Sequence, residues 1–302
     1  MSDDNSQKLE DFLSVLINDP GALEPSDSRY VPNLHGSNAE DVISTLARAC
    51  RLKAGSGVFY FTGQRGTGKS TELNRLGVEL SGGAIKPFVV DALDVLSEDH
   101  LIEVEDLLLM VAVSFAEKVY RETGENTLAP GGVFARFTKF LETEINFKDV
   151  KLYGITAEFK KAQKTISQRI RDYQIDRRES FANQCREFVT QLAEFVKQRL
   201  RRDKVVLIVD SLERLRGDGP RAAEMFDHVT RVLGGDDSKL RFPEVIVVYS
   251  VPGADAANDC RRRRKLARTA RPVGFSQQGR RHRTGARTAR RGARCLQGKP
   301  GA

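Results

Sequence analysis

The residues with the clearest capacity for chemistry form one short run, from Gly63 to Ser70, that reads Gly-Gln-Arg-Gly-Thr-Gly-Lys-Ser. This spacing fits the pattern GxxxxGK[ST], in which glycines take positive φ angles at no steric cost and turn backbone N–H groups around phosphate oxygens. Lys69 would reach the β- and γ-phosphates of a nucleotide, and the Ser70 hydroxyl would ligate Mg²⁺. A chance glycine-rich turn is the alternative, but an apolar run before the loop and helix-forming residues after it agree with a phosphate site. The residues of this stretch predicted to contact the nucleotide are Gly63, Gln64, Arg65, Gly66, Thr67, Gly68, Lys69, Ser70 and Thr71.

A second candidate group is the carboxylate of Asp210, which ends an unbroken apolar run from Val205 to Val209. Such a run is typical of a strand that is buried on both faces of a parallel sheet. Asp210 would then lie at the carboxyl end of the strand and hold Mg²⁺ beside the phosphate loop, directly or through water. A purely structural buried Asp is the alternative, but the upstream loop favours the metal site. A nucleotide and Mg²⁺ are therefore the predicted ligands.

Alternating strands and helices are predicted to position these groups. Four apolar runs predict strands at 58–61, 87–91, 205–210 and 244–250. Apolar residues at helical spacing predict helices at 37–50, from Thr71 onward, at 101–123, at 133–145 and at 181–199. Ser37 and Glu40 fit a capping box at the start of the first helix. The order of elements predicts an α/β fold with a parallel sheet.

The domain organisation follows from changes of pattern along the chain. Residues 1–36 read as a leader, and residues 37–260 as one domain. Within it, residues 124–200 read as a mainly helical insertion, with a short hairpin predicted between Val150 and Phe159. The insertion could also be a site for a partner protein.

Composition limits the class of protein. The 302 residues are 40% hydrophobic, enough for one large α/β domain. The acidic start, Met1 to Asn5, differs from a signal peptide, and the longest apolar run, Leu107 to Phe115, is too short to cross a membrane, so we expect a cytoplasmic protein. The four cysteines show no metal-ligand spacing, which favours reduced structural thiols.

The net charge of +8 is confined to the end of the chain. Residues 261–302 hold 15 of the 49 basic residues and no acidic one, so residues 1–260 hold 34 basic against 41 acidic residues, a net charge of −7. This tail has too few large apolar residues to fold alone, and we expect it to be disordered. Two interpretations stay open: a basic arm that binds DNA or RNA phosphates, or an out-of-frame translation of a GC-rich gene. The abrupt change in mid-domain favours the second.

The phrases around the two candidate sites, 61–73 and 209–215, resemble the additional-strand P-loop ATPases, a group that includes the AAA-like and STAND-type signalling ATPases of bacteria. The resemblance covers about residues 25–255. It implies a three-layer αβα fold with strand order 5-1-4-3-2, in which Gly63 to Ser70 form the Walker A loop and Asp210 the Walker B carboxylate. The fifth strand and the helical lid of such proteins are not recognisable in the sequence. We therefore expect an incomplete domain whose first strand has an open edge.

The resemblance also implies further site residues. Ser250 falls at the polar sensor position, where it could contact the γ-phosphate or orient water, although a solvated Ser at a strand end is the alternative. Such ATPases usually carry a catalytic Glu directly after the Mg²⁺ Asp, whereas this chain has Ser211 there and Glu213 two residues later. Glu213 is the candidate base that polarises water, and Arg214 either faces the phosphates or is a surface cation.

The function implied by the resemblance is that of a slowly hydrolysing Mg-ATPase acting as a molecular switch. An effector protein or a further C-terminal region would read the nucleotide state. The alternative is a nucleic-acid-associated helper ATPase that uses the basic tail. A small-molecule kinase is a third possibility, but no substrate-binding arginine pattern lies beside the loop.

Overall fold

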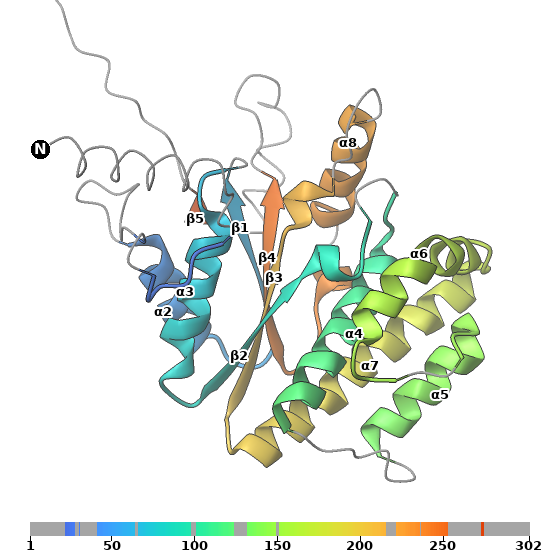
Figure 1. Ribbon diagram of the computed structural model, residues 1–302, viewed down its shortest axis with the longest axis horizontal. Coiled ribbons are helices and arrows are strands. Elements are labelled where there is room, and N and C mark those ends of the chain that lie inside the picture. Colours follow the sequence, from blue (N-terminus) through green and yellow to red (C-terminus); the bar gives the residue numbers. More distant parts are fainter. Residues whose placement is uncertain are drawn as a thin grey trace, which may run out of the picture.

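A parallel β-sheet lies between two groups of helices (Figure 1). The computed structural model describes residues 22–27, 30, 41–63, 66–97, 101–123, 132–148, 151–215, 222–235, 237–252 and 273–274. The strands are β1 (Gly57–Gly63), β2 (Ile85–Asp91), β3 (Lys204–Asp210), β4 (Val245–Pro252) and β5 (Val273–Gly274). They are hydrogen-bonded in the order β2-β3-β4-β1-β5, and every pair is parallel. The predicted α/β class with a parallel sheet is confirmed, as are the four predicted strands.

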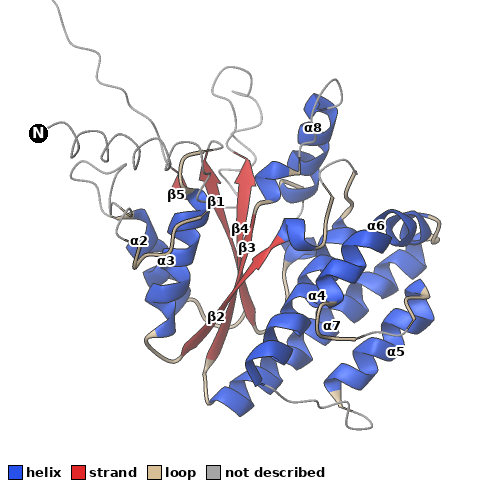
Figure 2. Ribbon diagram, in the orientation of Figure 1, coloured by secondary structure: helices blue, strands red, loops and turns tan. Residues whose placement is uncertain are grey.

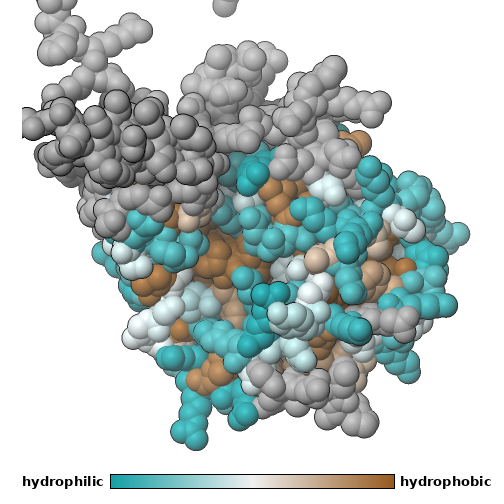
Figure 3. Space-filling model, viewed as in Figure 1, coloured by the Kyte–Doolittle hydropathy of each residue, from teal (hydrophilic) through white to brown (hydrophobic). Residues whose placement is uncertain are grey.

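The position of each strand in the sheet explains its sequence. β3 reads KVVLIVD and is buried at every residue after Lys204, because helices cover both of its faces. β2 lies at one edge of the sheet and carries Pro87, which has no backbone N–H to offer to a further strand. In Figure 3 hydrophobic side chains are visible between α3 (Lys69–Ser81) and α4 (Val104–Thr123), where this edge strand runs.

The smaller helical group packs α2 (Val42–Leu52) and α3 against one face of the sheet (Figure 2). Gly77 allows α3 to approach the strands closely, because a Cβ at this position would lie 3.2 Å from Val89 Cγ2. The start of α2 differs from the prediction. Its N-cap is Asp41, whose side chain accepts a hydrogen bond from the Ile43 N–H at 3.2 Å, whereas the predicted capping box at Ser37 and Glu40 lies outside the described residues. Asp is as good an N-cap as Ser, and sequence spacing does not choose between them.

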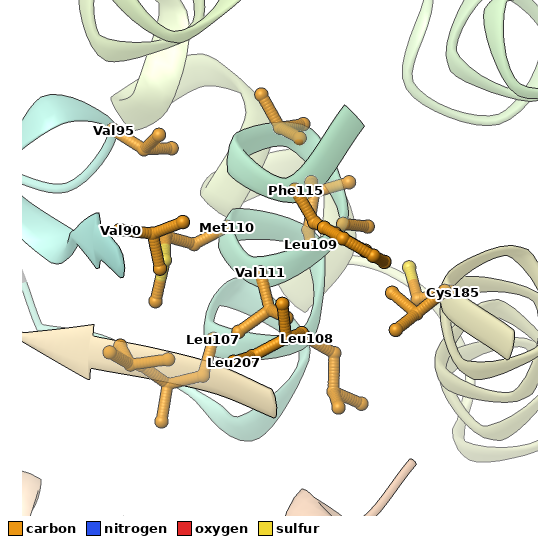
Figure 4. Close-up of a cluster of buried hydrophobic side chains, with 14 of the residues drawn as sticks. Val90, Val95, Leu107, Leu108, Leu109, Met110, Val111, Phe115, Cys185 and Leu207 are labelled. Carbon is orange, nitrogen blue, oxygen red and sulfur yellow. The ribbon is translucent and has the colours of Figure 1, made fainter. Parts of the chain in front are cut away.

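The larger group is built around α4, whose residues from Asp106 to Glu117 are all buried. A helix that is buried on all sides and mainly apolar belongs in the interior of a large domain. Figure 4 shows Leu107, Met110 and Val111 on the side of α4 towards Val90 and Leu207 of the sheet. α4 therefore fills the space between the sheet and the outer helices.

The outer helices of this group are α5 (Val133–Ile145), α6 (Ile155–Arg171) and α7 (Ile175–Leu200). The predicted helix at 133–145 is confirmed, and that at 181–199 is part of α7. The predicted hairpin between Val150 and Phe159 is wrong, because α6 begins at Ile155. Buried residues at helical spacing, Ile155, Phe159, Ile166 and Ile170, place one face of α6 in the core and outweigh the short alternation before them.

The open edge expected beside β1 is not fully open. Val273 pairs with Phe61 and Gly274 with Thr62, so a two-residue fifth strand completes the order 5-1-4-3-2. The expectation that this strand would be missing is therefore corrected. Strands pair through hydrogen bonds between backbone groups, so the edge strand β1 can pair with a segment that has no apolar sequence pattern. The rest of the Arg-rich tail, including the predicted disorder, lies outside the described residues.

The remaining described elements each add to the structure around the sheet, and their residues in the core include Leu212, Val229, Leu233 and Leu240. These elements are α8 (Ala222–Leu233) and three 3₁₀ turns, η1 (Ala92–Asp94), η2 (Leu212–Arg214) and η4 (Asp237–Leu240). η1 follows β2 and η2 follows β3, so both lie at the carboxyl end of the sheet. In the part of the chain that the structure describes, no helix combines the length and apolar character needed to cross a membrane.

Candidate functional site

The loop between β1 and α3 has the backbone shape that its glycines predict. Gly66 and Gly68 adopt positive φ angles of 80° and 77°, and Gly68 is the N-cap of α3. Because Gly68 has no side chain to cap the helix, the first-turn amides of α3 are available to an anion. Gln64 and Arg65, which we also predicted to contact the nucleotide, lie outside the described residues.

The first glycine of the loop is needed for close packing. A Cβ on Gly63 would lie 3.1 Å from Thr67 Oγ1 and 3.2 Å from Lys69 Cγ. These distances are tighter than ordinary side-chain contacts. Gly63 therefore allows the loop and the Lys69 side chain to lie directly over the end of β1.

Lys69 is held in a buried polar contact. Its side chain is only 2% exposed, and its Nζ lies 3.2 Å from Glu213 Oε1 on η2. Ser250, on β4 and fully buried, donates a hydrogen bond from its hydroxyl to the other carboxylate oxygen, Glu213 Oε2. Both oxygens of Glu213 therefore have partners, one from the first residue of α3 and one from a central strand.

The backbone at Ser211 explains how Glu213 reaches this position. Ser211 adopts φ 66°, a left-handed conformation uncommon for a residue other than glycine. The chain leaves β3, turns at Ser211 and forms η2, whose Arg214 N–H bonds to Ser211 O at 3.0 Å. Glu213 then faces inwards with 9% exposure, while Arg214 lies on the surface. The turn at Ser211 thus brings Glu213 beside Lys69.

Asp210 lies beside this contact and is 8% exposed. Burial raises the pKa of its carboxyl group above the ordinary value. Hydrogen bonds from the Ser70 side chain and the Ser211 backbone oppose this effect, and the charges of Glu213 and Asp91 add to it. Its Oδ1 is buried and has no hydrogen-bond partner among the described residues. The Asp210 carboxylate, with one oxygen lacking a hydrogen-bond partner, and the neighbouring Ser70 hydroxyl together offer oxygen ligands that suit a cation.

Asp91 also lies in this region, although we predicted no role for it from the sequence. It ends β2 and is the register partner of Asp210 across the β2–β3 pair. Its side chain accepts a hydrogen bond from the Leu93 N–H at 2.8 Å and caps η1. The signal was present in the sequence, since Asp91 ends an apolar run as Asp210 does.

Residues near the start of the described chain also reach the site. Leu23 donates its N–H to Thr71 Oγ1 at 3.1 Å, and Tyr30 donates its hydroxyl to Glu72 Oε1 at 3.2 Å. Thr71, one of the predicted nucleotide contacts, thus holds part of the predicted leader against the first turn of α3.

The arrangement gathers side chains from α3, η2, β3 and β4 at the carboxyl ends of the parallel strands. In such sheets ligands bind outside these ends, at the helix N-termini. The predicted residues Lys69, Ser70, Asp210, Glu213 and Ser250 all lie here, and β4 runs between the strands that carry Gly63 and Asp210. Among the described residues no group of three His, Cys, Asp or Glu side chains forms a metal cluster. The site therefore offers one carboxylate and one hydroxyl to a cation, next to amides suited to an anion.

Comparison with protein-family models found no match, and comparison with curated proteins found none either.

Proposed function

We propose that this chain binds a nucleoside triphosphate together with Mg²⁺ and hydrolyses it slowly as a molecular switch. The observation that carries this proposal is the buried contact of Lys69 with Glu213, beside Asp210, at the N-terminus of an α-helix that follows a glycine loop. A lysine and two carboxylates are seldom buried together without a task, because each ion loses its hydration. The resemblance to AAA-like and STAND-type ATPases supports the same proposal.

The phosphates would lie over the first turn of α3. Gly66 and Gly68 set the loop conformation that turns backbone amides towards them, and Lys69 would neutralise the terminal phosphates. ATP is the nucleotide that the resemblance favours.

The residues present fit Mg²⁺. Ser70 and Asp210 would hold the ion, since Asp210 Oδ1 is buried without a partner and Mg²⁺ in nucleotide sites commonly needs only one or two protein ligands besides phosphates and water. When bound, the ion would neutralise charge that develops on the phosphate oxygens. Asp91, at the same register on the neighbouring strand, adds negative potential at Asp210.

Glu213 would act as the base that polarises the attacking water. In the contact described above, Lys69 holds one of its oxygens and Ser250 the other. Phosphate binding would take Lys69 from Glu213 and leave Oε1 for water, while Ser250 keeps the carboxylate oriented. This exchange of partners would couple nucleotide binding to the position of η2, and a requirement to break a buried ion pair agrees with slow turnover.

Lys69→Ala tests the proposal in the full chain. We expect this variant to lose Mg-ATP binding in isothermal titration calorimetry, because the terminal phosphates lose their main cation. Lys151→Ala is the matched control, since Lys151 is exposed on the loop before α6. If Lys69→Ala bound Mg-ATP with the affinity of the parent chain while remaining folded by circular dichroism, the phosphate-site assignment would be wrong.

A further inference from the structure

A polar pocket lies away from the candidate nucleotide site, among α4, α6 and η1, which contact one another. Figure 1 shows α4 and α6 side by side. The pocket is a cavity of about 50 Å³ whose polar lining comes from Asp94, Ser114, Glu117, Lys118, Arg121 and Thr156. With roughly 10–15 Å³ needed for each water molecule, it holds the polar head of a small molecule. Asp94 and Thr156 also line an adjoining open groove with Lys160 and Lys161, which gives the rest of such a molecule a place to lie. In Figure 3 the side chains over α6 are largely hydrophilic.

Glu117 is already satisfied by the protein. Its carboxylate accepts hydrogen bonds from the Gly154 N–H at 3.2 Å, the Thr156 N–H at 3.0 Å and the Thr156 hydroxyl at 2.7 Å. Arg121 also pairs with it. The N-terminus of α6 is therefore occupied by a carboxylate of the protein itself, so a ligand must use the other groups of the pocket.

Three groups of the pocket have no close partner among the described residues, namely the buried Ser114 hydroxyl and the exposed side chains of Asp94 and Lys118. Ser114 is 3% exposed, and its Oγ has no hydrogen-bond partner in the described part of the chain. None of the ion pairs formed between described residues includes Asp94 or Lys118. Burial and the charge of Asp91 raise the pKa of Asp94 despite the more distant Lys118 and Lys160. Among the described residues, the pocket thus presents an exposed carboxylate and an exposed lysine that each form no ion pair, and a buried hydroxyl without a hydrogen-bond partner.

We propose that this pocket binds a small zwitterion of the amino-acid class, with its ammonium group on Asp94 and its carboxylate on Lys118 and the Ser114 hydroxyl. A ligand that carries both charges meets the two unpaired ions at once. A simple anion would leave Asp94 without a partner, and a simple cation would leave Lys118 without one. Charge complementarity therefore favours the zwitterion.

The pocket is placed to act on the candidate nucleotide site. Asp94 ends η1, which begins directly after Asp91 and lies against η2, the turn that carries Glu213. A ligand on Asp94 would favour one position of η1 and so one position of Glu213 relative to Lys69. This effector role rests on the proposed function, whereas binding to the pocket does not.

The test uses the full chain and the twenty proteinogenic amino acids, each at about 10 mM, in a thermal-shift assay followed by calorimetry. We expect at least one amino acid to raise the melting temperature. Asp94→Asn and Lys118→Ala should each weaken its binding by about 10-fold or more, as expected for loss of a charge-assisted hydrogen bond. Lys151→Ala should not change it. Both pocket variants replace surface charges that make no close ion pair with a described residue, so we expect them to fold.

Three results would overturn the site: no amino acid binds, binding is unchanged in both pocket variants, or inorganic phosphate binds as tightly as the best amino acid. Lys69→Ala should still bind the amino acid, which separates this proposal from the nucleotide site. If the amino acid binds and Mg-ATP does not, the proposed function fails while the pocket stands. If both bind with no effect on each other's affinity, the effector role is wrong; we expect a change of about fivefold or more.

Discussion

Replacing Glu213 with Gln separates two effects of this carboxylate on the nucleotide. In the structure Glu213 forms an ion pair with Lys69, the side chain that we expect to contact the terminal phosphates. Gln keeps the shape and a hydrogen-bond acceptor but removes the charge. Nucleotide binding should then become tighter, because phosphate no longer competes with a carboxylate for Lys69. Hydrolysis should be lost, because an amide cannot act as a base.

The expected gain in affinity follows from the geometry of the pair. Lys69 Nζ and Glu213 Oε1 are 3.2 Å apart, with side chains 2% and 9% exposed. At an effective dielectric constant of about 20, the attraction of two unit charges at this separation is about 5 kcal/mol. Desolvation offsets most of it, and the amide retains a hydrogen bond to Lys69, so about 1–3 kcal/mol is lost on substitution. This loss affects only the nucleotide-free state and corresponds to Mg-ATP binding tighter by about 5- to 150-fold.

Calorimetry with Mg-ATP and a phosphate-release assay on the same preparation measure both effects. Glu179→Gln, an exposed position on α7, is the matched control and should change neither. An affinity equal to or weaker than that of the parent chain would refute the competition between Glu213 and phosphate for Lys69. Hydrolysis at the parent rate in Glu213→Gln would show that another group polarises the water.

The remaining predictions concern stability, the metal site and a buried thiol. Gly68→Ala should lower the free energy of unfolding in urea by about 1–2 kcal/mol, because φ 77° is left-handed, whereas Gly82→Ala at φ −77° should be close to neutral. Both sites have open space around a Cβ, so equal effects of the two substitutions would contradict the backbone argument. Asp210→Asn should remove the Mg²⁺ dependence of nucleotide affinity. Burial raises the pKa of Asp210 in the folded state, so the protonated carboxyl group favours folding. This contribution is complete below the ordinary pKa and is lost as the pH rises through the raised pKa. The Asn variant should therefore be at least as stable as the parent chain at pH 7, and a large loss of stability in thermal unfolding would contradict this sign. Burial raises the pKa of the Cys50 thiol to about 12, so a thiol reagent at pH 8 should modify Cys50 only after unfolding, as mass spectrometry of the labelled peptides would show.

Most of the fold could be predicted because the strands and helices carry their own periodic patterns. The run from Val205 to Val209 is typical of a strand buried on both faces, and the structure places it inside the sheet, between β2 and β4. The hairpin expected near Val150 failed because a short alternation is compatible with a helix as well as a strand. Only the burial of Ile155 and Phe159 against the rest of the protein decides between them. The two-residue β5 left no signal, since its pairing with β1 is made by backbone groups.

The site was predictable to the extent that its residues follow the loop and strand patterns. Lys69, Ser70 and Asp210 are fixed by elements whose ends can be read from the sequence. The position of Glu213 could not be predicted in this way, because it depends on a left-handed backbone conformation at Ser211. Serine seldom adopts this conformation, so its presence in the sequence does not predict the turn. Asp91 was missed for a different reason. It ends an apolar run as Asp210 does, and the strand order implied by the resemblance already places its strand beside that of Asp210, but no motif residue drew attention to it.

The placement of Glu213 on a 3₁₀ turn rather than at the strand end has a mechanical consequence. A carboxylate directly after Asp210 would move only with β3, which is held on both sides by β2 and β4. Glu213 is instead carried by η2, which lies against η1. Asp91 caps η1, and Asp94 at the end of η1 lines the pocket between α4 and α6. The group proposed to polarise water is therefore carried by a turn that contacts η1 as well as β4. In a switch, a ligand in the α4–α6 pocket would then alter hydrolysis without disturbing the loop before α3. Coupling through these two turns predicts that an amino acid changes the rate of turnover more than it changes the affinity for Mg-ATP.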